Sequence, residues 1–82
     1  VNIKVKEKVP FEKMPSVEKK LKKFNLQLNG KGRILLRYSG TEALARVMVE
    51  GQSKEEIHNI AHSIADEIRE KIGVEEKLGR VL

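Results

Sequence analysis

The residues best suited to hold an anion are concentrated in residues 37–42, Arg-Tyr-Ser-Gly-Thr-Glu, and Arg46 follows them closely. An arginine guanidinium is a planar fork of donors that matches two phosphate oxygens and stays charged at any working pH. Ser39 and Thr41 add hydroxyl donors, and Gly40 allows backbone conformations in which successive N–H groups converge on an anion. The segment is therefore a candidate phosphate-binding loop.

The same residues also fit an ordinary polar hairpin loop. Serine, glycine and threonine are common in turns that bind nothing. Arg37 could form an ion pair with Glu42 or with Glu50 instead of meeting a ligand. Composition and spacing alone leave both interpretations open.

Two predicted strands must position this loop. Residues 33–38 and 44–50 each place apolar side chains at every second position, with arginines among the residues between them, which is typical of strands with one buried face. Their close spacing predicts an antiparallel pair joined by residues 39–43, so that Arg46 returns beside the loop. The apolar faces are formed by Ile34, Leu36 and Tyr38 and by Ala45, Val47 and Val49.

The remaining elements complete a small domain. Residues 1–5 alternate as a first strand, and Pro15-Ser16 opens a helix that ends at the turn of residues 29–32. Ser53 and Glu56 form a capping-box pattern before a second helix, which Gly73 is placed to end. The order predicts an α+β fold, a β-α-β-β-α two-layer sandwich with helices packed on a small, mostly antiparallel sheet. The apolar stripes of the helices are Val17, Leu21, Phe24 and Leu28, and then Ile57, Ile60, Ala61, Ile64, Ile68 and Ile72.

Length and charge narrow the classes of partner. The 82 residues make one domain, and the net charge of +5 is concentrated in residues 1–37, where eleven Lys or Arg face three Glu. A basic half favours an anionic partner such as nucleic acid, a membrane surface or a phosphorylated small molecule. The lack of cysteine fits a reducing, cytoplasmic setting, and no apolar run is long enough to span a bilayer.

Other possible sites are less well supported. His58, His62 and Asp66 recur at intervals of four, but Asn59 stands where a zinc-binding H-E-x-x-H motif needs Glu, so we expect a solvated flank and no metal site. A small basic nucleic-acid-binding module remains an alternative, although one Tyr, two Phe and no Trp offer little for stacking bases. Ser16 and Ser53 are expected to cap helices.

Residues 32–42, continuing through residues 45–51, resemble the last domain of the α-D-phosphohexomutases and are most similar to the phosphoglucosamine mutase branch. That family carries an Arg-x-Ser-Gly-Thr-Glu signature followed by a second Arg. The resemblance covers roughly residues 14–72 and includes the capped helix with its residues 61–66. Ala43 stands where many members have proline, which would stiffen the loop without supplying a donor.

The resemblance implies a role within a larger enzyme. A chain that begins with Val1 is expected to be an excised piece, here the C-terminal domain of a mutase. In this family a phosphoserine and a bound Mg²⁺ in other domains convert the sugar phosphate through a bisphosphate. For this branch the reaction is glucosamine 6-phosphate to glucosamine 1-phosphate. A phosphomannomutase or phosphoglucomutase parent is the alternative.

By position, the resemblance assigns the non-reacting phosphate of the sugar to five residues. Glu42 also matches the signature, and we expect it to shape the loop through a local hydrogen bond or ion pair. The catalytic serine and the metal site are expected elsewhere, so the fragment alone should not be catalytic and should hold no cofactor. Its expected partners are the phosphosugar and the other domains of the mutase, with no nucleic acid or membrane. The five phosphate-binding residues would be Arg37, Ser39, Gly40, Thr41 and Arg46.

Overall fold

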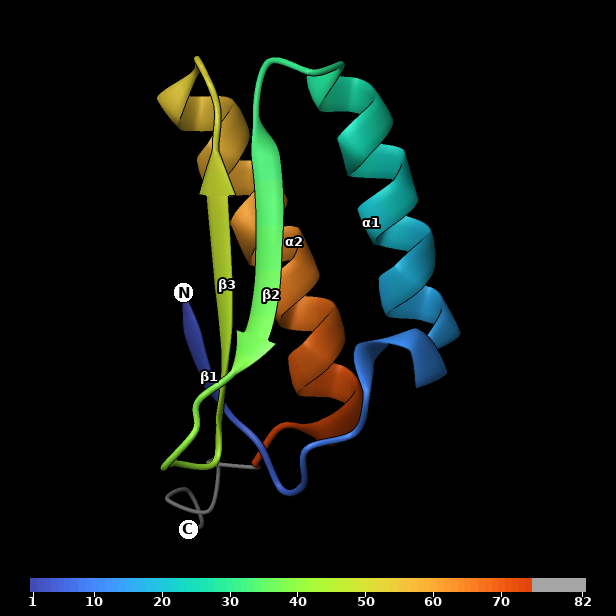
Figure 1. Cartoon of the computed structure of the whole chain (residues 1–82), viewed down its shortest axis with the longest axis vertical. Helices are drawn as coiled ribbons and strands as arrows, with labels where there is room; N and C mark the ends of the chain where they lie inside the picture. Colours follow the sequence, from blue (N-terminus) through green and yellow to red (C-terminus); the bar gives the residue numbers. More distant parts are fainter. Residues whose placement is uncertain (75–82) are drawn as a thin grey trace, which may run out of the picture.

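The computed structural model describes residues 1–74, and it has the predicted α+β architecture. Three strands form one sheet in the order β1-β3-β2, with β1 at Asn2–Lys4, β2 at Arg33–Tyr38 and β3 at Leu44–Glu50. Both pairings are antiparallel, so the described sheet is antiparallel throughout. The β2–β3 hairpin has the expected bounds, and its connection lies at the same end of the sheet as the segment that follows β1 (Figure 1).

Two helices cover one face of the sheet. Helix α1 spans Pro15–Leu28 and helix α2 spans Lys54–Ile72, and a short 3-10 helix, η1, at Phe11–Lys13 precedes α1. Figure 1 shows α2 running along the sheet with α1 beside it. No helix in residues 1–74 is long and apolar enough to cross a membrane.

The core lies between this helical layer and the inner face of the sheet. Burial of these aliphatic side chains is the main favourable term in the stability of such a domain. The predicted stripes are confirmed, with Leu21 and Ile57 only half-buried at their edges. The buried set from the strands is Ile3, Ala45 and Val47, and from the helices Val17, Phe24, Leu28, Ile60, Ala61, Ile64, Ala65, Ile68 and Ile72.

The opposite face of the sheet is open among the described residues. Leu35 and Met48 are register partners on this face, and they are 40% and 49% exposed. Arg33 and Glu50 form an ion pair at one side of them, with Nε and Oε1 2.7 Å apart. Arg37 and Arg46 lie at the other side, one register step of two residues away.

The helix ends follow local rules, with one correction. Ser53 caps α2 as predicted, because its Oγ accepts the backbone N–H of Glu56 at 3.2 Å. The prediction that Ser16 caps α1 is wrong. Pro15 occupies the first turn, where proline needs no donor, and this places Met14 at the N-cap without a side-chain cap. Ser16 is instead a residue within α1, and its Oγ is shielded from solvent and has no hydrogen-bond partner in residues 1–74.

Gly73 ends α2, but it does not adopt the left-handed backbone conformation that often explains a glycine at a helix C-terminus. Its φ is −73°, which any residue can adopt. A Cβ at this position would lie 2.5 Å from the carbonyl oxygen of Arg69 and 2.7 Å from its Cα. Glycine is needed here because the chain turns back tightly against the last turn of the helix and then pairs with Val5.

Candidate functional site

Two arginines of the candidate loop region face each other across the hairpin. Arg37 of β2 and Arg46 of β3 are direct register partners, and Asn2 of β1 is the next partner of Arg46. Side chains alternate along a strand, and Tyr38 and Ala45, the neighbours in sequence, point to the helices. Arg37, Arg46 and Asn2 therefore form a polar row across all three strands on the open face.

The arginine pair has no charge compensation in the described part of the chain. Neither guanidinium makes a hydrogen bond or an ion pair with residues 1–74. Glu50, one possible partner of Arg37, is bound by Arg33 instead. Like charges directly opposite each other destabilise an antiparallel pair. The pair thus offers unoccupied, converging charge to an anionic group.

Ser39 organises the loop that follows β2. It is the only buried polar residue among residues 1–74, with 9% exposure. Its N–H donates to the carbonyl of Leu44 at 2.9 Å, which continues the hairpin by one step. Its Oγ accepts the N–H groups of Thr41 at 3.3 Å and Glu42 at 3.2 Å. Those two N–H groups therefore turn inward onto the serine, and the hydroxyl keeps its own proton for donation.

Gly40 does not adopt the conformation that the sequence suggested. Its φ is not positive, whereas Gly30 has a φ of 79°. A Cβ on Gly40 would meet nothing within 4 Å. The expectation that Gly40 uses backbone space closed to other residues is wrong for this state of the loop. Gly40, Thr41 and Glu42 are all exposed, so the tip of the loop is open to a ligand.

The segment between β1 and η1 braces the base of the loop. The hydroxyl of Tyr38 donates to the carbonyl of Val9, and the ring stacks on Phe11 with centroids 4.5 Å apart. Burial, together with the nearby charge of Glu7, raises the pKa of the Tyr38 phenol, so this donor keeps its proton. Lys8 Nζ donates to the carbonyl of Ser39 at 2.6 Å. No periodic pattern in the sequence marks these contacts, so they are not predictable from the residue types alone.

A surface pocket lies beside the loop, but neither Arg37 nor Arg46 lines it. Its walls are mainly aliphatic, which does not suit a phosphate. The candidate anion site is therefore the arginine row with the loop tip. The pocket is lined by Lys4, Val5, Glu42, Ala43, Leu44 and Val74.

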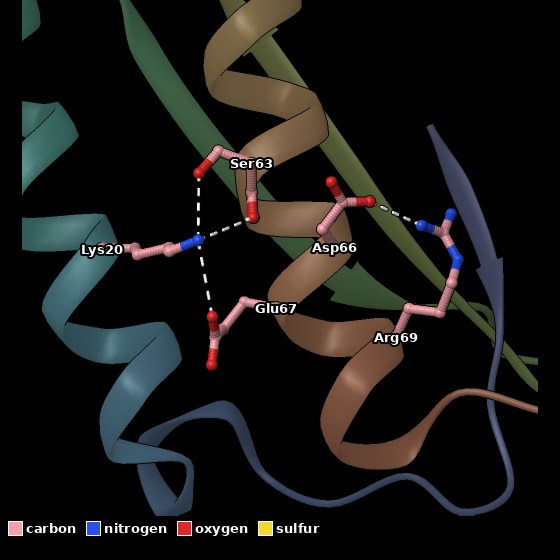
Figure 2. A network of polar contacts seen from close by, with 5 residues as sticks. All are labelled: Lys20, Ser63, Asp66, Glu67 and Arg69. Carbon is pink, nitrogen blue, oxygen red and sulfur yellow. Dashed lines mark hydrogen bonds and ion pairs between the residues drawn. The ribbon is translucent and has the colours of Figure 1, made fainter.

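The histidine stripe of α2 forms no ligand cluster. The rings of His58 and His62 are exposed, with centroids 4.3 Å apart. Asp66 accepts a hydrogen bond from Arg69 at 2.7 Å and points toward it in Figure 2. Residues 1–74 contain no group of three His, Cys, Asp or Glu able to hold a metal ion.

One lysine of the basic helix is used inside the fold. Figure 2 shows Lys20 reaching from α1 to α2, where its Nζ lies 3.0 Å from Ser63 Oγ, 3.2 Å from the Ser63 carbonyl oxygen and 3.4 Å from Glu67 Oε1. The hydroxyl of Ser16 and then Lys20 lower the pKa of the Glu67 carboxyl, although Ser16 Oγ lies outside ideal hydrogen-bond geometry. Lys20 therefore joins the two helices, which reduces the free positive charge on α1.

The chain is similar to a family of sugar-phosphate mutase domains and to several phosphoglucosamine mutases. The sequence model of the family described as "Phosphoglucomutase/phosphomannomutase, C-terminal domain" matches residues 1–67. A phosphoglucosamine mutase of Chlamydia felis is 45% identical over 74 residues, which are 90% of this chain and 16% of the relative. One of Lawsonia intracellularis is 47% identical over 66 residues, 80% of this chain and 15% of the relative. One of Solibacter usitatus is 45% identical over 73 residues, 89% of this chain and 16% of the relative.

Proposed function

Because the chain belongs to the phosphoglucomutase/phosphomannomutase C-terminal domain family, we propose that it is the phosphate-holding domain of a phosphoglucosamine mutase. It spans about one sixth of the length of the relatives named above, so the rest of that enzyme would lie in other domains. The enzyme would interconvert glucosamine 6-phosphate and glucosamine 1-phosphate through a phosphoserine and a bisphosphorylated sugar. The three relatives named above are phosphoglucosamine mutases, which favours this sugar over mannose or glucose phosphates.

The observation that carries the proposal is the uncompensated arginine pair. Arg37 and Arg46 are held in register on one rigid hairpin and make no ion pair in residues 1–74. A phosphate dianion placed over them would accept charge-assisted hydrogen bonds and would remove their mutual repulsion. The negative charge of a phosphate would therefore compensate the two positive charges of Arg37 and Arg46.

The loop residues would complete the grip. Ser39 and Thr41 would donate their hydroxyl protons to phosphate oxygens, and Gly40 would let the ligand approach the backbone of the exposed tip. Glu42 would shape the turn through its N–H bond to Ser39 Oγ. Binding energy from a phosphate that does not react can be used to orient the end of the sugar that does.

Catalysis would come from the other domains. These would supply the phosphoserine and Mg²⁺, and the described part of this chain has no cluster of acidic residues for a metal. Its partners would be the phosphosugar and those domains. We place the enzyme in the cytoplasm. A chain without cysteine is compatible with this reducing compartment, and so is a phosphorylated sugar as substrate.

An NMR titration of the 82-residue chain tests the proposal. The ligands are glucosamine 6-phosphate, inorganic phosphate and unphosphorylated glucosamine, at equal ionic strength. We expect amide shifts at residues 37–42 and at Arg46 with the two phosphorylated ligands only. Binding should be weak, because one domain supplies only part of the cleft.

The titration can also fail in informative ways. No response at those amides at high phosphate concentration would overturn the proposal. A response to RNA by the lysines of α1, without any to phosphate, would favour a nucleic-acid-binding module. The choice of sugar is decided by assaying the complete enzyme against glucosamine, mannose and glucose phosphates.

A further inference from the structure

Lys8 connects the segment after β1 to the candidate phosphate loop. Its Nζ donates to the carbonyl oxygen of Ser39 at 2.6 Å, across 31 positions of sequence. We propose that Lys8 is a positioning residue of the phosphate site, which holds Ser39 and the turn around it in the form that receives the ligand. This inference rests on the proposed function and adds a residue that lies outside the signature of residues 37–42.

The Ser39 carbonyl needs a donor from outside the hairpin. In a regular ladder the N–H of Leu44 would donate to it, because the N–H of Ser39 already donates to Leu44. Here the N–H of Leu44 donates to the carbonyl of Glu42 instead, at 2.9 Å. Without Lys8 the carbonyl of a buried residue would lose its partner, and such a loss is costly. Lys8 thus stabilises the point at which the strand becomes the loop.

The contact depends on a well-held segment. On one side of Lys8, the N–H of Val5 donates to Ala43 at 3.0 Å and that of Lys6 donates to Ile72 at 2.8 Å. On the other side, the carbonyl of Val9 receives the hydroxyl of Tyr38. The backbone is therefore fixed on both sides, and only the lysine side chain must be ordered to reach Ser39.

Ser39 connects Lys8 to the atoms at the tip of the loop that would contact the ligand. Ser39 Oγ accepts from Thr41 and Glu42, so the position of Ser39 sets the position of the whole loop tip. The Lys8 ammonium also adds positive charge at the base of the loop, and two of its three protons are left after the bond to Ser39. Lys8 therefore acts on phosphate affinity through the loop and not as a catalytic group.

Two variants of Lys8 and one control test the inference. Lys8→Met removes the charge and the donor while keeping the aliphatic stem, and Lys8→Arg keeps both. Lys6→Met is the matched control, because Lys6 is exposed and, within residues 1–74, it forms a hydrogen bond only through its backbone N–H. The probe is inorganic phosphate, followed by NMR, and thermal unfolding checks that each variant is folded.

We expect Lys8→Met to move the amide signals of Ser39, Thr41 and Glu42 before any ligand is added. Its phosphate affinity should fall by roughly fivefold to tenfold, the change expected when the net contribution of one typical hydrogen bond is lost. Lys8→Arg should restore most of that affinity, and Lys6→Met should change it by less than about twofold.

Two results are decisive against it. If Lys8→Met binds phosphate as well as the unaltered chain and its loop signals do not move, the inference is overturned while the proposed function stands. If the unaltered chain does not bind phosphate at the arginine pair, the proposed function falls and takes this inference with it. A loss of affinity that Lys8→Arg fails to restore would also count against a positioning role for this ammonium.

Discussion

Arg37 and Arg46 are direct cross-strand partners, and within residues 1–74 neither guanidinium forms an ion pair. Such a pair costs stability in the free protein and gains it back when an anion binds. Replacing one of these arginines is therefore expected to weaken anion binding without lowering the stability of the unliganded chain. This combination would distinguish a ligand site from an ordinary charged surface.

Arg46→Met should weaken phosphate binding by at least about tenfold, which corresponds to ~1.4 kcal/mol. The unliganded chain should be unchanged in stability or more stable by a few tenths of a kcal/mol, because a like-charge pair is removed. Thermal unfolding with and without phosphate measures both effects. For the unaltered chain, phosphate at 100 times its Kd should add about 2.7 kcal/mol to the free energy of unfolding.

Arg33→Met is the matched control for that experiment. Arg33 lies on the same face of the same strand and pairs with Glu50 at an exposed position. Its loss should change stability by less than about 1 kcal/mol and leave phosphate binding intact. Equal losses of affinity in the Arg33 and Arg46 variants would mean that only general charge matters.

Ser39→Ala should disrupt the loop without harming the rest of the fold. The buried hydroxyl accepts two N–H groups, so its removal should cost about 1–2 kcal/mol and should speed hydrogen exchange at Thr41 and Glu42. Ser53→Ala makes a useful comparison, because it removes one helix cap at a similar cost of about 1 kcal/mol. Only the Ser39 variant should lose phosphate affinity.

Gly73→Ala and Gly40→Ala should differ sharply in stability. The added Cβ at Gly73 would strike the backbone of Arg69, so we expect a loss of at least about 2 kcal/mol in urea unfolding. The Cβ at Gly40 would enter open space, so its effect should stay within about 0.5 kcal/mol. A large destabilisation by Gly40→Ala would show that the loop adopts another conformation in solution.

The stability of the helix pair should depend on pH through Glu67. Its pKa in the folded chain is lowered by Ser16 and Lys20, so its contribution is present above the unfolded pKa of about 4.3 and is lost as the pH falls through the lower folded value. The difference in unfolding free energy between the unaltered chain and Glu67→Gln should therefore shrink toward zero in acid. Glu70→Gln, at an exposed position of the same helix, is the matched control for the loss of a glutamate.

Much of this fold can be predicted from the sequence because its elements are strongly periodic. The side-chain pattern of residues 33–38 and 44–50 predicted both strands and the return of Arg46 beside the loop, and the structure adds that Arg46 is paired with Arg37. The stripe from Ile57 to Ile72 gave the second helix. These features depend on contacts that are local in the chain, where residue patterns are most informative.

The details that escaped prediction depend on tertiary contacts or on crowding. The bond from Lys8 to Ser39 joins distant segments, and nothing in the residue types marks it. Ser16 was predicted to cap a helix that begins one residue earlier, at Pro15. Gly40 was expected to need an unusual φ, whereas an added Cβ would meet nothing there and would instead strike backbone atoms at Gly73, against Arg69, and at Gly32, against Glu50. Whether the predicted residues hold a phosphate stays a prediction.

The arginines that face each other lie only nine positions apart in the chain, on one continuous hairpin. Closing so short a loop loses little entropy, so this charge pair can be assembled early in folding, before the bond from Lys8 to Ser39 closes a much longer loop. An anion that binds the pair would then stabilise the transition state as well as the native state. Phosphate should raise the refolding rate in stopped-flow experiments, and an effect confined to the unfolding rate would show that the hairpin forms late.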